Sequence, residues 1–137
     1  MIKRALTIAT AALVTAGVLA GTPEAASAAS GCSGQQIRHW VLDDSRGLPI
    51  STIRLYYNAR TGINCAVNVW RPGTRGKRGI HIGIWTAKSG WKRDEGSFKY
   101  YAGPVRVYGK HRCVRVSGWA QVGRYRPTFD SGRIACR

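Results

Sequence analysis

Residues 80–85, Ile80-His81-Ile82-Gly83-Ile84-Trp85, place an isoleucine at every second position. Successive side chains of an extended strand point to opposite faces of a sheet, so this pattern predicts a strand with one apolar face. Residues 51–58 follow the same rule, with Ile53, Leu55 and Tyr57 on one face. A turn-like cluster, Asn58-Ala59-Arg60-Thr61-Gly62, leads from there into an alternating segment that contains Cys65, Val67 and Val69. We expect these last two segments to pair as a hairpin.

Valines continue the alternation at positions 105 and 107, and again at 114 and 116. The residues between them, Tyr108-Gly109-Lys110-His111, predict a second hairpin turn. After the first 28 residues, no stretch of about eleven residues keeps a helical period, and Gly and Pro interrupt the chain often. The sequence therefore predicts an all-β domain of about six to eight short strands, either a small sandwich or a partly closed barrel.

The start of the chain has the composition of a secretory signal peptide. Lys3 and Arg4 precede an apolar stretch over residues 5–20, and Ala26-Ser27-Ala28 has the small residues of a cleavage site. The apolar stretch is short and interrupted by Thr and Gly, and no later segment resembles a transmembrane span. We therefore expect a signal peptide over residues 1–28 and a single exported, soluble domain over residues 29–137.

The four cysteines, Cys32, Cys65, Cys113 and Cys136, all follow the expected cleavage site. An exported protein meets an oxidising environment, so we expect two disulfides. Of the three possible connectivities we favour Cys32 with Cys65 and Cys113 with Cys136, because these close loops of about 30 and 20 residues. A zinc site is the less favoured alternative, since no pair has C-x-x-C spacing and the histidines lie at no ligand spacing.

Cys32 has a second interpretation. Residues 29–32, Ala-Ser-Gly-Cys, loosely resemble a lipoprotein cleavage box, in which the cysteine becomes the lipidated first residue. The usual Leu is missing from this box, and lipidation would leave an odd number of cysteines in an oxidising compartment. We therefore favour a disulfide for Cys32.

The chain is strongly basic. Its 137 residues include 22 Lys and Arg against 6 Asp and Glu, a formal net charge of +16. Residues 1–28 contain Lys3, Arg4 and Glu24, so 20 bases and 5 acids remain after cleavage, a charge of +15. Few of these bases can find an ionic partner within the domain, so a positive field must remain over its surface. We expect partners among extracellular polyanions such as wall polymers, with non-specific nucleic acid binding as another outcome.

Two basic clusters contain the candidate polyanion-binding residues. The first lies in a Gly-rich connection, where unusual backbone angles let an arginine approach an anion closely and grip it in bidentate fashion. The second is interleaved with Trp119 and Tyr125, and such aromatic and basic mixtures bind sugar polymers or single-stranded nucleic acid. The residues are Arg71, Arg75, Lys77 and Arg78 in the first cluster, and Lys110, Arg112, Arg115, Arg124 and Arg126 in the second.

The remaining carboxylates and histidines form no known catalytic motif such as H-E-x-x-H, G-x-S-x-G or a Walker loop. A small secreted ribonuclease is the enzyme alternative, and it would use Glu95, His81 and His111 with an arginine. No spacing constrains that set, so we expect no catalysis, no metal and no cofactor. A cationic antimicrobial effector is a further alternative, although alternating strands present no obvious amphipathic membrane-active segment.

Two longer motifs remain. One is Leu55-Tyr56-Tyr57-Asn58 followed by Thr61-Gly62-Ile63-Asn64-Cys65, and the other is Tyr100-Tyr101-Ala102-Gly103-Pro104-Val105, continuing through Tyr108 to Cys113-Val114. Together with Cys32-Ser33-Gly34, they resemble the small secreted spore-associated protein A family of streptomycetes and related actinobacteria, over about residues 32–118. The resemblance implies a disulfide-bonded extracellular protein without enzymatic activity that associates with spore or hyphal surfaces. We therefore expect a secreted protein that is retained on the cell wall or spore surface.

Overall fold

The computed structural model describes residues 31–136, and the expected signal peptide lies outside them. The described residues form eight strands and no helix, so the all-β prediction is confirmed. The strands are β1 (Gln35–Asp43), β2 (Pro49–Asn58), β3 (Ile63–Trp70), β4 (Lys77–Thr86), β5 (Gly90–Gly96), β6 (Tyr101–Tyr108), β7 (Val114–Val122) and β8 (Thr128–Ile134). Accordingly, this part of the chain contains no helix long and apolar enough to cross a bilayer.

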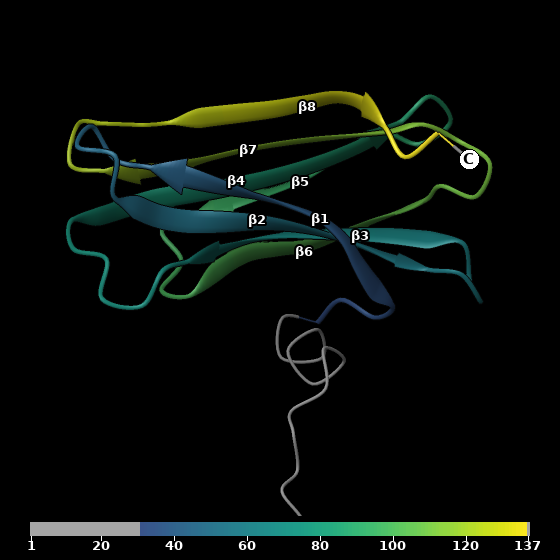
Figure 1. Cartoon of the computed structure of the whole chain (residues 1–137), viewed down its shortest axis with the longest axis horizontal. Helices are drawn as coiled ribbons and strands as arrows, with labels where there is room; N and C mark the ends of the chain where they lie inside the picture. The colour runs from purple at the N-terminus through teal and green to yellow at the C-terminus, as the bar shows by residue number, and fades with distance from the viewer. Residues whose placement is uncertain (1–30, 137) are drawn as a thin grey trace, which may run out of the picture.

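The strands form two four-stranded antiparallel sheets, ordered β1-β2-β3-β6 and β5-β4-β7-β8. The sheets pack face to face, so the architecture is a sandwich (Figure 1). The two sheets meet at one edge, where the Gly103 backbone N–H of β6 donates a 2.7 Å hydrogen bond to the Asp94 carboxylate of β5. The expected hairpin of residues 51–69 is confirmed, because β2 pairs with β3 in a register that places Leu55 opposite Ala66.

The prediction of a second hairpin, between the valine-rich segments around residues 105–107 and 114–116, is wrong. β6 pairs with β3 and β7 pairs with β4 and β8, so the turn at residues 109–112 carries the chain from one sheet to the other. The physical reason lies in the apolar faces of the two strands. Val105 and Val107 of β6 and Val114 and Val116 of β7 are all buried in the same core, which the two strands reach from opposite sheets.

The isoleucines of β4 form the centre of that core, as their alternation predicts. Ile80, Ile82 and Ile84 are fully buried, together with Ile53 and Leu55 of the facing sheet. Gly118 of β7 lets the sheets approach, since a Cβ at this position would lie 2.6 Å from the Ile53 Cδ1 atom. Burial of large aliphatic side chains contributes about 1.5–3 kcal/mol each to stability.

Both predicted disulfides, Cys32–Cys65 and Cys113–Cys136, are confirmed. The described chain has no free cysteine, so the zinc and lipid-anchor interpretations of these residues are wrong. The first disulfide ties the residues before β1 to β3, and the second ties the start of β7 to the residues after β8. Each therefore anchors one end of the described chain to a central strand.

Turns gather at the two ends of the sandwich (Figure 1). The β1–β2 turn, the β3–β4 connection and the β7–β8 turn share one end, where the Gly123 N–H donates to the Gly76 carbonyl at 2.9 Å. The β6–β7 turn and the C-terminal disulfide lie at the other end. The first predicted basic cluster therefore lies at one end, and Lys110 and Arg112 of the second cluster lie at the other.

Candidate anion-binding site

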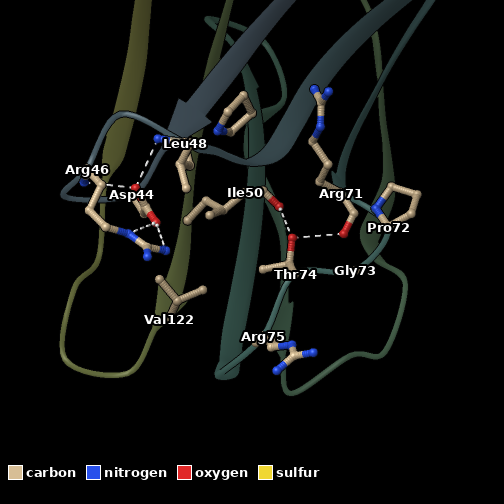
Figure 2. A pocket seen from close by; sticks show the side chains of 11 residues that line it. Asp44, Arg46, Leu48, Ile50, Arg71, Pro72, Gly73, Thr74, Arg75 and Val122 are labelled. Carbon is tan, nitrogen blue, oxygen red and sulfur yellow. Dashed lines mark hydrogen bonds and ion pairs between the residues drawn. The ribbon is translucent and has the colours of Figure 1, made fainter.

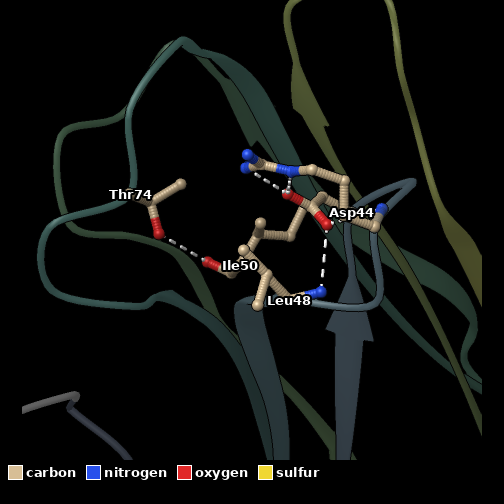
Figure 3. Close-up of polar contacts among 5 residues, drawn as sticks. Asp44, Leu48, Ile50 and Thr74 are labelled. Carbon is tan, nitrogen blue, oxygen red and sulfur yellow. Dashed lines mark hydrogen bonds and ion pairs between the residues drawn. The ribbon is translucent and has the colours of Figure 1, made fainter.

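The β1–β2 turn forms one wall of a pocket at the first of these ends, and Asp44 organises it (Figure 3). The Asp44 carboxylate accepts hydrogen bonds from the Arg46 and Leu48 backbone N–H groups at 2.8 and 3.0 Å. It also forms an ion pair with the Arg46 guanidinium at 2.9 Å. The Leu48 backbone bond, followed by the Arg46 side-chain bond, lowers the pKa of Asp44 below its usual 3.8. The Arg46 charge is therefore neutralised within the turn.

The β3–β4 connection forms the other wall, and it begins with a tight turn. Arg71-Pro72-Gly73-Thr74 has proline second, a glycine with φ of 80° third, and a 3.2 Å bond from the Thr74 N–H to the Arg71 carbonyl. These are the features of a type II turn, which proline and glycine favour at these positions. The Arg71 N–H and the Thr74 hydroxyl both bond to the Ile50 carbonyl, at 2.8 and 3.2 Å. The turn is thus fixed to the start of β2.

The space between these walls, which we call the loop-end pocket, has a volume of about 350 Å³ (Figure 2). Apolar groups of Leu48, Ile50 and Val122 line it, together with three arginines and Asp44. The ion pairs within residues 31–136 are Arg46–Asp44 and Arg115–Asp130, so Arg71 and Arg75 have no carboxylate partner there. Their side chains extend in different directions on either side of Thr74 (Figure 2). Two arginines at the edge of the pocket therefore have no ionic partner in the described chain.

The structure brings together only part of the predicted basic set. Arg71 and Arg75 line the loop-end pocket, and Lys77 and Arg78 are exposed at the start of β4 beside it. The Lys77 amine donates to the Lys99 carbonyl at 3.1 Å and lies 5.8 Å from the Trp70 ring centre. Lys77 is therefore held near the pocket by contacts of its own.

The second predicted cluster is divided. Lys110 and Arg112 lie in the turn between β6 and β7, at the end opposite the pocket, and Arg112 is half-buried. Arg115 lies on the outward side of β7, where its guanidinium bonds both carboxylate oxygens of Asp130 at 2.8 and 2.6 Å. This contact raises the pKa of Arg115 and lowers the pKa of Asp130. Arg124 and Arg126 follow β7 and lie at the end that contains the pocket.

Comparison with known proteins identifies a relative of this chain. The chain is 30% identical to Spore-associated protein A of Streptomyces coelicolor over 122 residues, which cover 82% of this chain and 76% of that protein. The chain belongs to the spore-associated protein A family. No family model matches the sequence, and no solved structure matches the fold.

The motifs that suggested the spore-associated protein A family build the fold rather than the loop-end pocket. The Asn58 side-chain oxygen accepts bonds from the Arg60 and Thr61 N–H groups at 3.0 and 3.3 Å, which closes the β2–β3 turn. Gly62 follows with φ of 72°, and the next strand carries Cys65 to its disulfide. Arg71 and Arg75 lie outside these motifs.

A second group of basic residues, on the sheet that contains β4, was not predicted from the sequence. Four arginines place their guanidiniums over tryptophan rings: Arg93 and Arg115 over Trp91, Arg126 over Trp119 and Arg133 over Trp85. Arg115 and Arg126 belong to the second predicted cluster, whereas Arg93 and Arg133 belong to neither. The alternation over residues 80–85 predicted an outward side that carries His81, Gly83 and Trp85. Which residues of other strands lie beside them depends on the sheet register, which the sequence does not show.

Proposed function

We propose that the protein is exported and attaches to anionic polymers of the spore or cell surface through its loop-end pocket, without catalysing a reaction. The observation that carries this proposal is the pair Arg71 and Arg75, which flank the pocket and have no carboxylate partner in the described chain. The name of the relative, Spore-associated protein A, supports the location.

A polymer fits this pocket better than a single small anion. The guanidiniums of Arg71 and Arg75 extend in different directions, so they meet two anionic groups on a longer molecule more easily than one group between them. Guanidinium binds phosphate and carboxylate in bidentate fashion, which suits phosphodiester and acidic sugar polymers alike. The type II turn holds the Arg71 backbone in place, which reduces the entropy that binding must remove.

The first test measures binding to heparin as a model polyanion over a range of salt concentrations. Binding through two arginines predicts that Arg71→Gln with Arg75→Gln reduces the slope of log K against log salt by about one to two, as expected for two lost ionic contacts. Arg60→Gln with Lys110→Gln is the matched control, because it removes the same charge at the opposite end of the sandwich. Equal losses from both pairs would show that net charge, not the pocket, determines binding.

One observation favours a second candidate, the ribonuclease. Glu95 of β5 lies directly opposite His81 of β4, on the same side of the sheet as Arg93. His111 does not join them, because it precedes β7 whereas His81 pairs near the end of that strand, with Trp119. Incubating the purified protein with RNA distinguishes the two functions. RNA cleavage that is lost in His81→Gln and retained in His111→Gln would show that the protein is a ribonuclease and would contradict the non-catalytic proposal. RNA that stays intact would be the result expected of a non-catalytic binding protein.

A further inference from the structure

A second candidate site lies on the face of the β5-β4-β7-β8 sheet that points away from the core, which we call the outer face. The strand register arranges its side chains in rows across the sheet. One row contains Trp91, Trp85, Arg115 and Arg133, the next Arg93, Gly83, Ser117 and Asp130, and a third Glu95, His81, Trp119 and Thr128. Neighbouring strands lie about 4.8 Å apart, so each row is a compact line of chemically different groups.

Two glycines allow the tryptophans to lie close to the strands. A Cβ at Gly83 would lie 3.2 Å from the Trp91 ring, and a Cβ at Gly79 would lie 3.2 Å from the Trp119 ring. A side chain at either position would therefore push these rings outward. The outer face is built so that aromatic rings cover the backbone of β4.

The arginines of this face are held in place by the rings. The guanidinium carbons of Arg126, Arg93 and Arg133 lie 4.6, 5.2 and 5.5 Å from the centres of the Trp119, Trp91 and Trp85 rings. None of these three arginines forms an ion pair with a residue in 31–136. A guanidinium stacked on a ring keeps the N–H groups at its edge free to bind an anion. These arginines are therefore both positioned and uncompensated.

Between β4, β7 and β8 the outer face contains a pocket of about 300 Å³. Its polar lining consists of His81, Ser117, Thr128 and Asp130, and Trp119 forms an aromatic wall. His81 is only 9% exposed, and its Nδ1 atom is buried without a hydrogen-bond partner. Buried polar atoms without a partner are uncommon in folded proteins, so the described residues leave part of the hydrogen-bonding capacity of His81 unused.

The protonation of His81 suits a hydroxyl-bearing ligand. Burial lowers the pKa of His81 and outweighs the opposing effect of the Glu95 charge. The imidazole is therefore neutral near pH 7, with one nitrogen that donates a hydrogen bond and one that accepts. Sugar hydroxyls can do both, and so can the hydroxyls of Ser117 and Thr128.

We propose that the outer face binds an acidic polysaccharide, with one sugar ring in the pocket beside Trp119 and the acidic groups of successive units on the stacked arginines. This site is separate from the loop-end pocket and does not depend on the function proposed for that pocket. A neutral sugar would leave Arg93, Arg126 and Arg133 without an anion. A single-stranded nucleic acid also carries one charge per unit and can stack its bases on aromatic rings, so its binding at this face is one of the outcomes of the test.

The test is a titration of the purified protein, followed by ¹⁵N–¹H NMR, with oligogalacturonate, neutral maltohexaose and oligo(U) RNA as probes. We expect oligogalacturonate to shift the Trp119 indole N–H signal saturably. Trp119→Ala, followed by the backbone amide signals of Ser117 and Thr128, should weaken binding about tenfold, equivalent to about 1.4 kcal/mol. Thr128→Val, which removes one hydroxyl and keeps the shape of the side chain, should weaken it as well.

Two control variants separate this site from general effects. Tyr100→Ala removes a 65% exposed aromatic ring outside the outer face and should leave the affinity within about twofold. Arg71→Gln with Arg75→Gln should leave the Trp119 shift intact, even if it abolishes heparin binding.

Three results would overturn the proposal. The first is no saturable shift of the Trp119 indole signal with oligogalacturonate. The others are an affinity for maltohexaose equal to that for oligogalacturonate, or a higher affinity for oligo(U), each measured from the same indole signal.

Discussion

Single residues decide how the basic loops of this protein are held. Asp44 forms the β1–β2 turn by accepting two backbone hydrogen bonds and pairing with Arg46, and Thr74 fixes the β3–β4 connection to the Ile50 carbonyl. Neither residue carries the positive charge that identified the β3–β4 connection in the sequence. Their effect is to place Arg71 and Arg75 around a preformed pocket rather than on free chain.

The lowered pKa of Asp44 predicts how pH affects stability. A carboxyl whose pKa is lower in the folded protein stabilises it above the unfolded pKa, and this contribution disappears as pH falls through the folded pKa. Asp44→Asn should therefore destabilise the protein at pH 7, and the difference from the wild type should shrink as pH falls from about 5 to 2. Urea unfolding at several pH values measures this difference.

Asp43→Asn is the matched control, since the neighbouring Asp43 carboxylate makes none of the contacts that form the turn. It should leave the free energy of unfolding nearly unchanged at every pH. A difference between wild type and Asp44→Asn that stays constant with pH would contradict the proposed role of the charged carboxylate.

At the scale of the strands, Asn68 is the main polar link between the two sheets. It is fully buried in β3, and its side-chain amide donates to the His81 and Trp119 carbonyls of the facing sheet at 3.0 and 3.1 Å. These carbonyls belong to the strand pair that carries the outer-face pocket. Asn68 thereby connects the packing of the core with the position of that pocket.

Replacing the amide should be costly. Asn68→Asp removes both donated bonds and places an oxygen against two carbonyls, so we expect a loss of about 3 kcal/mol or more in the free energy of unfolding. Thermal or urea unfolding measures it. Asn58→Asp is the control, because the Asn58 oxygen that accepts the turn bonds is kept, and it should change stability by less than about 0.5 kcal/mol. Comparable losses in the two variants would contradict the inter-sheet role of Asn68.

Sequence patterns predicted which segments are strands better than how the strands pair. Alternation identified the buried isoleucines of β4 and the β2–β3 hairpin, since both depend on local periodicity. The β6–β7 connection was mistaken for a hairpin because a short turn looks the same whether it joins neighbours in one sheet or crosses between sheets. In β3 both faces are buried, and Cys65 and Val67 pack with Cys32 and Tyr56 in a cluster separate from the main core.

For the whole molecule, the sequence revealed the amount of charge but not its distribution. The Gly-rich composition of residues 71–79 identified Arg71 and Arg75, because local turns decide where they lie. The second cluster could not be placed, since its residues divide between two ends and one face according to long-range pairing. The contacts of arginines with tryptophan rings form between residues of different strands, so the alternation indicates the outward Trp85 but not the arginine beside it.

Attachment to a surface is most directly tested in the producing culture, by dividing it into medium, cell wall and spores before and after a high-salt wash. We predict that the wild-type protein is retained on walls or spores and released by salt, because electrostatic binding weakens as ionic strength rises. Arg71→Gln with Arg75→Gln should move the protein into the medium. Wild-type protein found only in the medium, or surface protein that salt does not release, would contradict electrostatic attachment through the loop-end pocket.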